Sequence, residues 1–203
     1  MKFSCEKYIL QSACAIATRA TASKSPIPAL EGLLLQAGID LKVTGYDLRK
    51  GIYTNIAADI SEQGSIVVGS RFFGEMIRRL PDGIVTISVD HNNNVNVKCG
   101  KSEFNFMGIS AEDYPEMPTV DGLNNITLPQ QILKSMINQT MFAISDNDSR
   151  PVYTGSLFEV ESGVLAMVSV DGYRLAIRRE AIEGPEEHNE FIVPGSALSD
   201  IER

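Results

Sequence analysis

"YILQSACAIATRATASKSPIPALEGLLL" at residues 8–35 and "QILKSMINQTMFAISDNDSRPVYTGSLF" at residues 131–158 decide the fold, because the second stretch repeats the first. They align without a gap at an offset of 123 residues, and apolar, proline and glycine positions coincide. The matches include Ile9 with Ile132, Leu10 with Leu133, Pro28 with Pro151, Gly32 with Gly155 and Leu34 with Leu157. Self-similarity at a fixed offset is typical of duplicated units. The sequence therefore predicts two copies of one structural unit.

Two further pairs of stretches extend this alignment. "LKVTGYDL" (41–48) meets "LAMVSVDG" (165–172), and "VVGSRFFGEM" (67–76) meets "IVPGSALSDI" (192–201), while the offset rises to 125. We expect domains at 1–122 and 123–203, the second one incomplete. Since a half-built sheet would expose a long unpaired edge, a fragment of a longer protein is favoured over an abbreviated second domain.

The sequence predicts that each domain consists of two β-α-β-β-β units. Apolar residues recur at helical spacing over 7–20, 70–80 and 130–145. Alternating or β-prone runs predict strands at 3–6, 30–36, 40–46, 49–60, 65–68, 84–89, 95–99 and 102–108. We therefore expect an α+β fold with helices on one side of antiparallel sheets.

Bulk composition is that of an ordinary globular chain. Of 203 residues, 43% are hydrophobic and 22% are charged, and no apolar run approaches the length that crosses a bilayer. The start "MKFSCEKYIL" has no continuous apolar segment after Lys2, so no secretory signal is expected. The three cysteines form no C-x-x-C pair, which argues against a disulfide framework or a zinc site. We expect a cytoplasmic protein without membrane contact.

No motif predicts catalysis or a cofactor. "CGKS" (99–102) lacks the glycine that a phosphate-binding loop needs five residues before Gly100, and "PGSAL" (194–198) lacks the second glycine of a nucleophile elbow. His91 and His188 have no evident partner. Asp146 and Asp148 lack the glycine and closing glutamate of a calcium loop. The chain is predicted to be non-enzymatic, with no metal and no cofactor.

Charge is distributed unevenly along a chain whose net charge is −8. No acidic residue lies between Lys7 and Lys24. The predicted helix 130–145 contains no acidic residue and carries Lys134. The segment 70–80 carries three arginines against Glu75. Carboxylate-poor helix faces favour loose phosphate contact, although solvated faces that lack acids by chance are the alternative, and Asp200 and Glu202 weaken the pattern.

"MVSVDGYRLAI" at 167–177 reads as two strands around a turn at Asp171-Gly172. Tyr173 and Arg174 are large side chains beside that turn. They either close a hairpin or line a place where a partner docks.

The motifs "MKF" (1–3), "PIPALEGLLL" (26–35), "RPVYTGSLFE" (150–159) and "DGYRLA" (171–176) occur in an order that resembles the bacterial DNA polymerase III β subunits, the sliding clamps. The resemblance covers the whole chain. It implies a DNA-clamp fold with three such domains per subunit and head-to-tail homodimers that form a closed ring. It also implies a non-catalytic processivity factor, with helices lining the hole through which double-stranded DNA passes. This chain would hold the first domain and part of the second.

The resemblance implies two sets of functional residues around that ring. Lys24 and Asn147 would occupy corresponding loops that face DNA, in sequence-independent contact with phosphates. Four helix residues are added to this set: Arg71, Arg78, Arg79 and Lys134. From "KSEFNFMGI" (101–109), an apolar strand that should be paired, the ring-interface candidates are Lys101, Phe104 and Phe106.

The resemblance also implies a peptide pocket at the "DGYRLA" turn. There the DNA polymerase III catalytic subunit, the clamp loader and other clamp-binding-motif proteins would insert short linear peptides. The lining residues would be Tyr153, Val170, Gly172, Tyr173, Arg174 and Leu175. Tyr153 departs from the aliphatic residue expected there. "TGYDLRKG" (44–51) in the first copy is expected to lack the turn and hence the pocket.

Two other function classes are weighed against a clamp. A small hydrolase predicts titratable residues clustered in a cleft, and the sequence offers no such cluster. A protein-interaction scaffold without a DNA role would share the fold and differ in how the basic residues act.

Overall fold

The computed structural model describes residues 1–118, 126–147, 149–183 and 188–202. The chain divides into two compact units, Met1–Pro118 (unit 1) and Thr119–Arg203 (unit 2), and each is described by itself. The predicted boundary between residues 122 and 123 lies outside the described residues.

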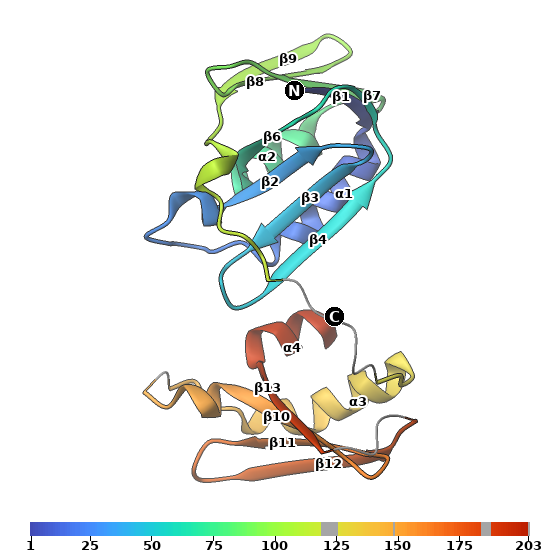
Figure 1. Cartoon of the computed structure of the whole chain (residues 1–203), viewed down its shortest axis with the longest axis vertical. Helices are drawn as coiled ribbons and strands as arrows, with labels where there is room; N and C mark the ends of the chain where they lie inside the picture. The colour runs from blue at the N-terminus through green and yellow to red at the C-terminus, as the bar shows by residue number, and fades with distance from the viewer. Residues whose placement is uncertain (119–125, 148, 184–187, 203) are drawn as a thin grey trace. The chain divides into compact units, whose positions relative to one another are not determined.

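Unit 1 contains two helices and two antiparallel sheets (Figure 1). Its helices are α1 (Lys7–Thr18) and α2 (Ser70–Arg79). One sheet has the order β4-β3-β2-β6 and the other the order β5-β1-β7-β8-β9. The strands are β1 (Lys2–Glu6), β2 (Gly32–Ala37), β3 (Leu41–Tyr46), β4 (Gly51–Ile56), β5 (Asp59–Glu62), β6 (Gly64–Gly69), β7 (Ile84–Val89), β8 (Asn94–Cys99) and β9 (Ser102–Met107).

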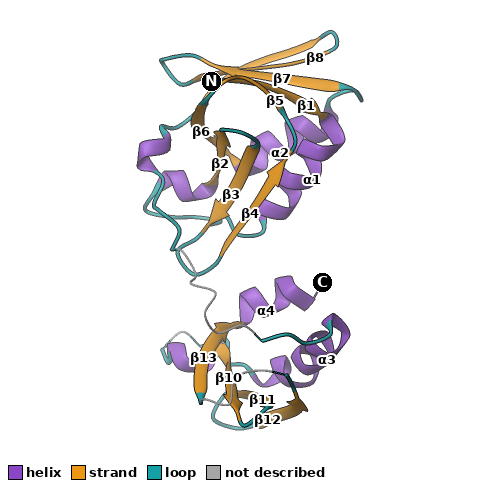
Figure 2. Ribbon diagram, turned by 45° about the vertical axis from the view of Figure 1, so that its right-hand side comes forward, coloured by secondary structure: helices purple, strands orange, loops and turns teal. Residues whose placement is uncertain are grey.

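The strand that precedes each helix crosses to the other sheet. β1 pairs with β7, whereas β6 pairs with β2. Both sheets contribute to one core with the helices, in which Phe3, Leu10, Leu35 and Phe73 have no exposed surface. The predicted α+β class with duplicated units is thus confirmed (Figure 2).

Two predicted strands of unit 1 differ from the observed ones. The expected strand 49–60 is two strands, β4 and β5, that belong to different sheets. The expected strand 30–36 begins at Gly32, because Pro28–Glu31 forms a short 3-10 helix, η1, with proline in its first turn.

Unit 2 repeats half of this arrangement. α3 (Gln130–Thr140) and α4 (Gly195–Glu202) accompany one antiparallel sheet of order β12-β11-β10-β13. Its strands are β10 (Gly155–Glu161), β11 (Val164–Val170), β12 (Leu175–Ala181) and β13 (Asn189–Pro194). The helix expected over 130–145 ends at Thr140, and short 3-10 helices follow at Met141–Ala143 (η3) and Pro151–Thr154 (η4).

The two cores coincide position by position, which confirms the repeat. All seven buried core members among the described residues of unit 2 lie 123, 124 or 125 residues after a buried member of the unit 1 core. The pairs are Met136 with Ala13, Ile137 with Cys14, Phe158 with Leu35, Val160 with Ala37, Leu165 with Leu41, Met167 with Val43 and Leu198 with Phe73.

All three cysteines are buried and free. Burial raises the pKa of the Cys14 thiol to about 12 and that of Cys5 to about 11, so both stay protonated at neutral pH. Among the described residues, no helix has the length and apolar character that crossing a membrane requires.

Gly45 fixes how closely α1 approaches β3. A Cβ atom built on Gly45 would lie 2.0 Å from the carbonyl oxygen of Ala17, near the end of α1. We expect Gly45→Ala to lower the free energy of unfolding of unit 1 by about 1–3 kcal/mol, because the helix must move. Urea denaturation followed by far-UV circular dichroism measures this.

Gly38→Ala is the matched control, since the nearest atom to its Cβ is 4.0 Å away. Equal stability of the two variants would show that the close approach does not restrict the packing.

Candidate functional site

Two of the three arginines of α2 share one acidic neighbour. Glu75 Oε2 lies 2.6 Å from Arg78 Nη2 and 3.7 Å from Arg79 Nε. The hydrogen bond from Arg78 is the main cause that lowers the pKa of Glu75. Arg71 is exposed and takes part in no ion pair within the described part of the chain. The positive face of this helix is therefore partly neutralised toward its C-terminal end.

The predicted DNA-facing residues of the two loops are exposed. Lys24 precedes η1 and Asn147 precedes η4, so the two loops correspond, as the alignment predicts. Asn147 Oδ1 accepts a hydrogen bond of 3.0 Å from the Ser149 amide. Lys134 on α3 is less available, because its Nζ lies 3.5 Å from a carboxylate oxygen of Glu202 on α4.

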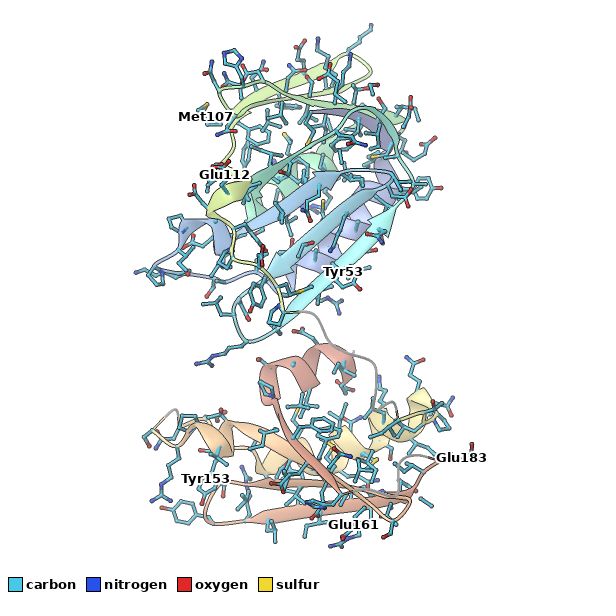
Figure 3. All side chains as sticks on the ribbon, viewed as in Figure 1. Tyr53, Met107, Glu112, Tyr153, Glu161 and Glu183 are labelled. Atoms are coloured by element: carbon cyan, nitrogen blue, oxygen red, sulfur yellow. The ribbon has the colours of Figure 1, made fainter. Side chains whose placement is uncertain are left out.

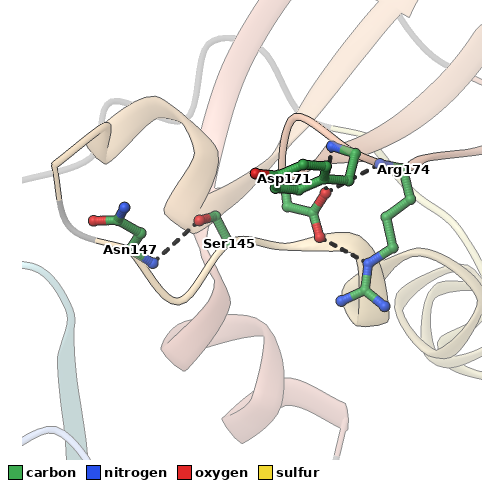
Figure 4. A network of polar contacts seen from close by, with 5 residues as sticks. Ser145, Asn147, Asp171 and Arg174 are labelled. Atoms are coloured by element: carbon green, nitrogen blue, oxygen red, sulfur yellow. Dashed lines mark hydrogen bonds and ion pairs between the residues drawn. The ribbon is translucent and has the colours of Figure 1, made fainter.

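The segment 167–177 forms the predicted hairpin, with β11 antiparallel to β12. Asp171 holds its turn, as Figure 4 shows. Its carboxylate accepts hydrogen bonds from the amides of Tyr173 at 2.9 Å and Arg174 at 3.1 Å, and from Arg174 Nε at 2.8 Å. Gly172 supplies the left-handed conformation with φ of 95°. The pKa of Asp171 is lowered, above all by the Tyr173 amide.

The same turn exists in unit 1, so the prediction that "TGYDLRKG" lacks it is wrong. Asp47 Oδ1 accepts hydrogen bonds from the amides of Arg49 at 2.9 Å and Lys50 at 2.8 Å. Leu48 takes the place of Gly172 and has φ of 71°. The turn was missed because no glycine marks it, and the Asp47 side chain provides the local hydrogen bonds instead.

The predicted pocket residues surround this turn in unit 2. Val170 and Leu175 are paired across the hairpin, and Leu175 is 60% exposed. The Tyr173 side chain is fully exposed. Tyr153, on η4 and labelled in Figure 3, is half-buried, and the Arg150 guanidinium lies 5.8 Å from the centroid of its ring.

Sequence reasoning missed Phe142 as a neighbour of this turn. Its ring is 59% exposed and lies 5.7 Å from the Arg174 guanidinium. In the sequence, Phe142 lies in the apolar run "MFAI" (141–144) and looks like a core residue, so no sequence signal indicated it.

The predicted interface strand, β9, lies at the edge of its sheet. Phe104 is 45% exposed and Lys101 is exposed in the preceding turn. Phe106 lies on the same face of β9 as Phe104 and is half-buried, with its ring centroid 5.2 Å from that of Phe72 and 6.3 Å from that of Phe73. Met107, labelled in Figure 3, is more exposed than either phenylalanine and was not among the predicted residues.

Within the described residues, one group of side chains could converge on a metal ion: Glu159, Glu161 and His188 on β10 and beside β13. Their ligand atoms lie within 4.8 Å of one another, and Glu161 and His188 are exposed. The group lies at the opposite end of the sheet from the Asp171 turn.

Comparison with known proteins shows to which family this duplicated α+β fold belongs. The family description "DNA polymerase III beta subunit, N-terminal domain" matches residues 1–118, and the description of the central domain of the same subunit matches residues 127–203. Solved structures that match over the whole chain share the DNA-clamp fold. The chain belongs to the DNA polymerase III beta subunit family.

Individual relatives agree with this assignment. The chain is 32% identical over 213 residues to the beta sliding clamp of Bacillus subtilis, covering 100% of this chain and 56% of that protein. A crystal structure of a putative DNA polymerase III beta subunit from Eubacterium rectale matches with a TM-score of 0.94 at 35% identity, again over 100% of this chain and 56% of that one. A crystal structure of the DNA polymerase III subunit beta from Pseudomonas aeruginosa matches with a TM-score of 0.92 at 28% identity, over 100% and 56% of the two chains. The chain spans about half the length of the curated relatives it matches.

The hydrogen bonds at Asp171 give a prediction for its titration. Its depressed pKa means that the carboxylate stabilises the turn at pH values above its unfolded pKa, and that this contribution is lost as pH falls through the folded pKa. We expect Arg174→Ala to raise the pKa of Asp171 only in part, because the Tyr173 amide still donates. An NMR pH titration of the Asp171 carboxyl carbon measures this.

Arg179→Ala, which removes an arginine of β12 outside this turn, is the control and leaves the pKa unchanged. Full return of the Asp171 pKa to its usual range in Arg174→Ala would contradict the dominant role of the amide.

Proposed function

We propose that this chain contributes the first domain and part of the second domain of a sliding clamp, a non-catalytic factor that holds the DNA polymerase III catalytic subunit on duplex DNA. The observation that carries the proposal is the match of residues 1–118 and 127–203 to successive domains of one clamp subunit. The coincident cores of the two units support it, since a ring of repeated domains needs repeats with equal packing. A replication factor of this kind acts in the bacterial cytoplasm.

DNA would contact the carboxylate-poor surfaces. Lys24 and Arg71 are exposed and take part in no ion pair among the described residues, so they are the strongest candidates. Asn147 offers a neutral polar contact in the loop that corresponds to that of Lys24. Arg78, Arg79 and Lys134 would contribute less, because Glu75 and Glu202 neutralise part of their charge. Few and weak phosphate contacts suit a ring that slides, since they carry no sequence information.

Clamp-binding peptides, including those of the clamp loader, would dock at the Asp171 turn. Leu175, Val170 and Tyr153 would form the apolar floor, while Tyr173 and Arg174 offer long side chains with polar ends. No heavy atom lies within 4 Å of a Cβ built on Gly172, so a peptide backbone could approach this turn closely.

The homodimer of the complete protein would close at the β9 edge. Lys101 and Phe104 are exposed there, and the half-buried Phe106 follows two residues further along the same face of β9. An unpaired edge strand with an exposed phenylalanine is a surface that proteins normally cover.

A protein-interaction scaffold without a DNA role remains the second candidate, because the exposed apolar residues at the Asp171 turn would serve it equally. The charge of Lys24 and Arg71 separates the two functions, since only a clamp needs it.

Reversal of these charges tests the DNA contact. We expect the double variant Lys24→Glu with Arg71→Glu to bind duplex DNA more weakly at low salt. The slope of log K against log salt should fall by about 0.9 for each lost phosphate contact. Fluorescence anisotropy with a labelled duplex measures the slope.

Lys98→Glu is the charge control and makes half the charge change of the double variant, because Lys98 on β8 lies 3.1 Å from Glu103 and belongs to no predicted DNA contact. A fall of the slope by half as much in this control would mean that net charge alone explains the binding, and it would favour the scaffold.

Truncation at the turn tests the peptide pocket. We expect Leu175→Ala to weaken binding of the DNA polymerase III catalytic subunit about tenfold, since an exposed apolar anchor is lost. Surface plasmon resonance with the immobilised chain measures the dissociation constant. Val164→Ala removes a partly exposed valine at the far end of the same strand pair and should leave affinity unchanged. Wild-type affinity in Leu175→Ala would remove this residue from the pocket.

A further inference from the structure

Two glutamates of β10 lie on the outward face of the unit 2 sheet, the face turned away from the helices. Side chains alternate between the two faces of a strand, and Phe158 and Val160 belong to the core, so Glu159 and Glu161 point outward. Glu159 is half-buried, and Glu161, labelled in Figure 3, is exposed. Both carboxylates are therefore available on the outer side of this sheet.

β13, the neighbour of β10, brings two further titratable side chains to the same face. Glu190 is directly opposite Glu159, and His188 precedes Glu190 by two residues. The ligand atoms of Glu159, Glu161 and His188 lie within 4.8 Å of one another. His188 Nε2 also lies 3.9 Å from a carboxylate oxygen of Glu190. These four residues are here called the β10–β13 cluster.

The β10–β13 cluster concentrates negative charge that no basic side chain neutralises. Like charges directly opposite each other on paired strands destabilise the pairing, and Glu159 with Glu190 is such a pair. Within the described part of the chain, no lysine or arginine forms an ion pair with any of the three glutamates, and His188 is the one residue that pairs with Glu190. A bound cation would remove this repulsion.

Unit 1 has neutral residues at the corresponding positions. In the order of the cluster they are Gln36, Gly38, Gln63 and Ser65, and Gln36 pairs with Ser65 as Glu159 pairs with Glu190. All four are exposed and line one open hollow, although unit 1 contains a second sheet. The position is thus accessible in a unit that has both sheets, and the ligating side chains distinguish unit 2.

The donor atoms of the cluster suit a transition metal. Zn²⁺ binds imidazole nitrogen together with carboxylate oxygens, whereas Mg²⁺ and Ca²⁺ prefer oxygen ligands alone. Zinc with four ligands at about 2.0–2.2 Å needs ligand atoms about 3.4 Å apart, so the side chains must approach by about 1 Å, which rotation on an open surface permits. The three cysteines, which are also zinc ligands by type, are buried.

We propose that Glu159, Glu161 and His188 bind one Zn²⁺ ion on the outward face of unit 2. Water completes the coordination, and the charge of Glu190 strengthens the binding. The ion joins β10 to the start of β13 and stabilises the pairing of two strands whose facing glutamates repel each other. The sequence predicts no metal, because His188 is far from β10 along the chain and only strand pairing brings them together. This site lies beyond the proposed function and does not depend on it.

Calorimetric titration of the full chain with ZnCl₂ tests the site. We expect one zinc ion per chain. Loss of an outer-shell partner of a metal ligand already costs about tenfold in affinity, so Glu159→Gln and His188→Ala, which remove ligands, should each cost at least that much. Zinc should also raise the melting temperature of the wild type more than that of either variant, because a ligand that binds only the folded state stabilises it. NMR of the 15N-labelled protein should show that zinc shifts the ring nitrogens of His188.

His91→Ala is the matched control, since it removes the other histidine of the chain, which is exposed in the turn between β7 and β8 of unit 1. This variant should bind zinc as the wild type does. Far-UV circular dichroism confirms that each variant folds. An absence of binding at millimolar zinc would overturn the proposal, as would equal zinc affinity in the wild type, Glu159→Gln and His188→Ala. Binding of Ca²⁺ as tight as that of zinc would also overturn it, because it would show an unspecific acidic surface.

Discussion

A β-sheet that carries apolar side chains on both faces must be covered on both faces, and this constraint governs each unit. The inner face is covered by helices, in unit 1 through contacts as close as that between Gly45 and the Ala17 carbonyl. The outer face of unit 1 is covered by residues 109–117, in which Tyr114 is almost fully buried. The corresponding face of unit 2 carries Leu157, Val168 and Ile192 at the same register positions, so the same constraint applies to it.

Periodicity was sufficient to predict the helices and most strands. Apolar residues at helical spacing predict 7–20 and 70–80 to within two residues of α1 and α2, because one face of each helix is fully buried. The break between β4 and β5 was not predictable in the same way. The chain changes sheets at Ala57 and Ala58, where no glycine or proline marks a break in the strand. Only the pairing with other strands places β4 and β5 in different sheets.

In the candidate sites, too, local contacts could be predicted from the sequence and long-range contacts could not. The bond between Glu75 and Arg78 follows from their spacing on one helix and could have been read from the sequence. The pair of Lys134 with Glu202 joins residues far apart in the chain, so composition suggested a freer positive charge on α3 than the structure contains. Acid-free helices therefore overstate positive potential wherever a neighbouring helix supplies the carboxylate.

The two Asp turns illustrate how one backbone shape can serve two purposes. Asp47 and Asp171 make the same pair of hydrogen bonds to the amides two and three residues ahead. The leucine and the glycine beside the turn change places between the two units. Leu48 stands where unit 2 has Gly172, and Gly51 stands where unit 2 has Leu175. In unit 1 the absence of a side chain at Gly51 leaves the space that Met117 fills. In unit 2 Leu175 is 60% exposed beside a glycine. The hydrogen bonds of the aspartate therefore set the turn geometry in both copies, and the residue at the position of Gly51 and Leu175 sets the size of the space beside the turn.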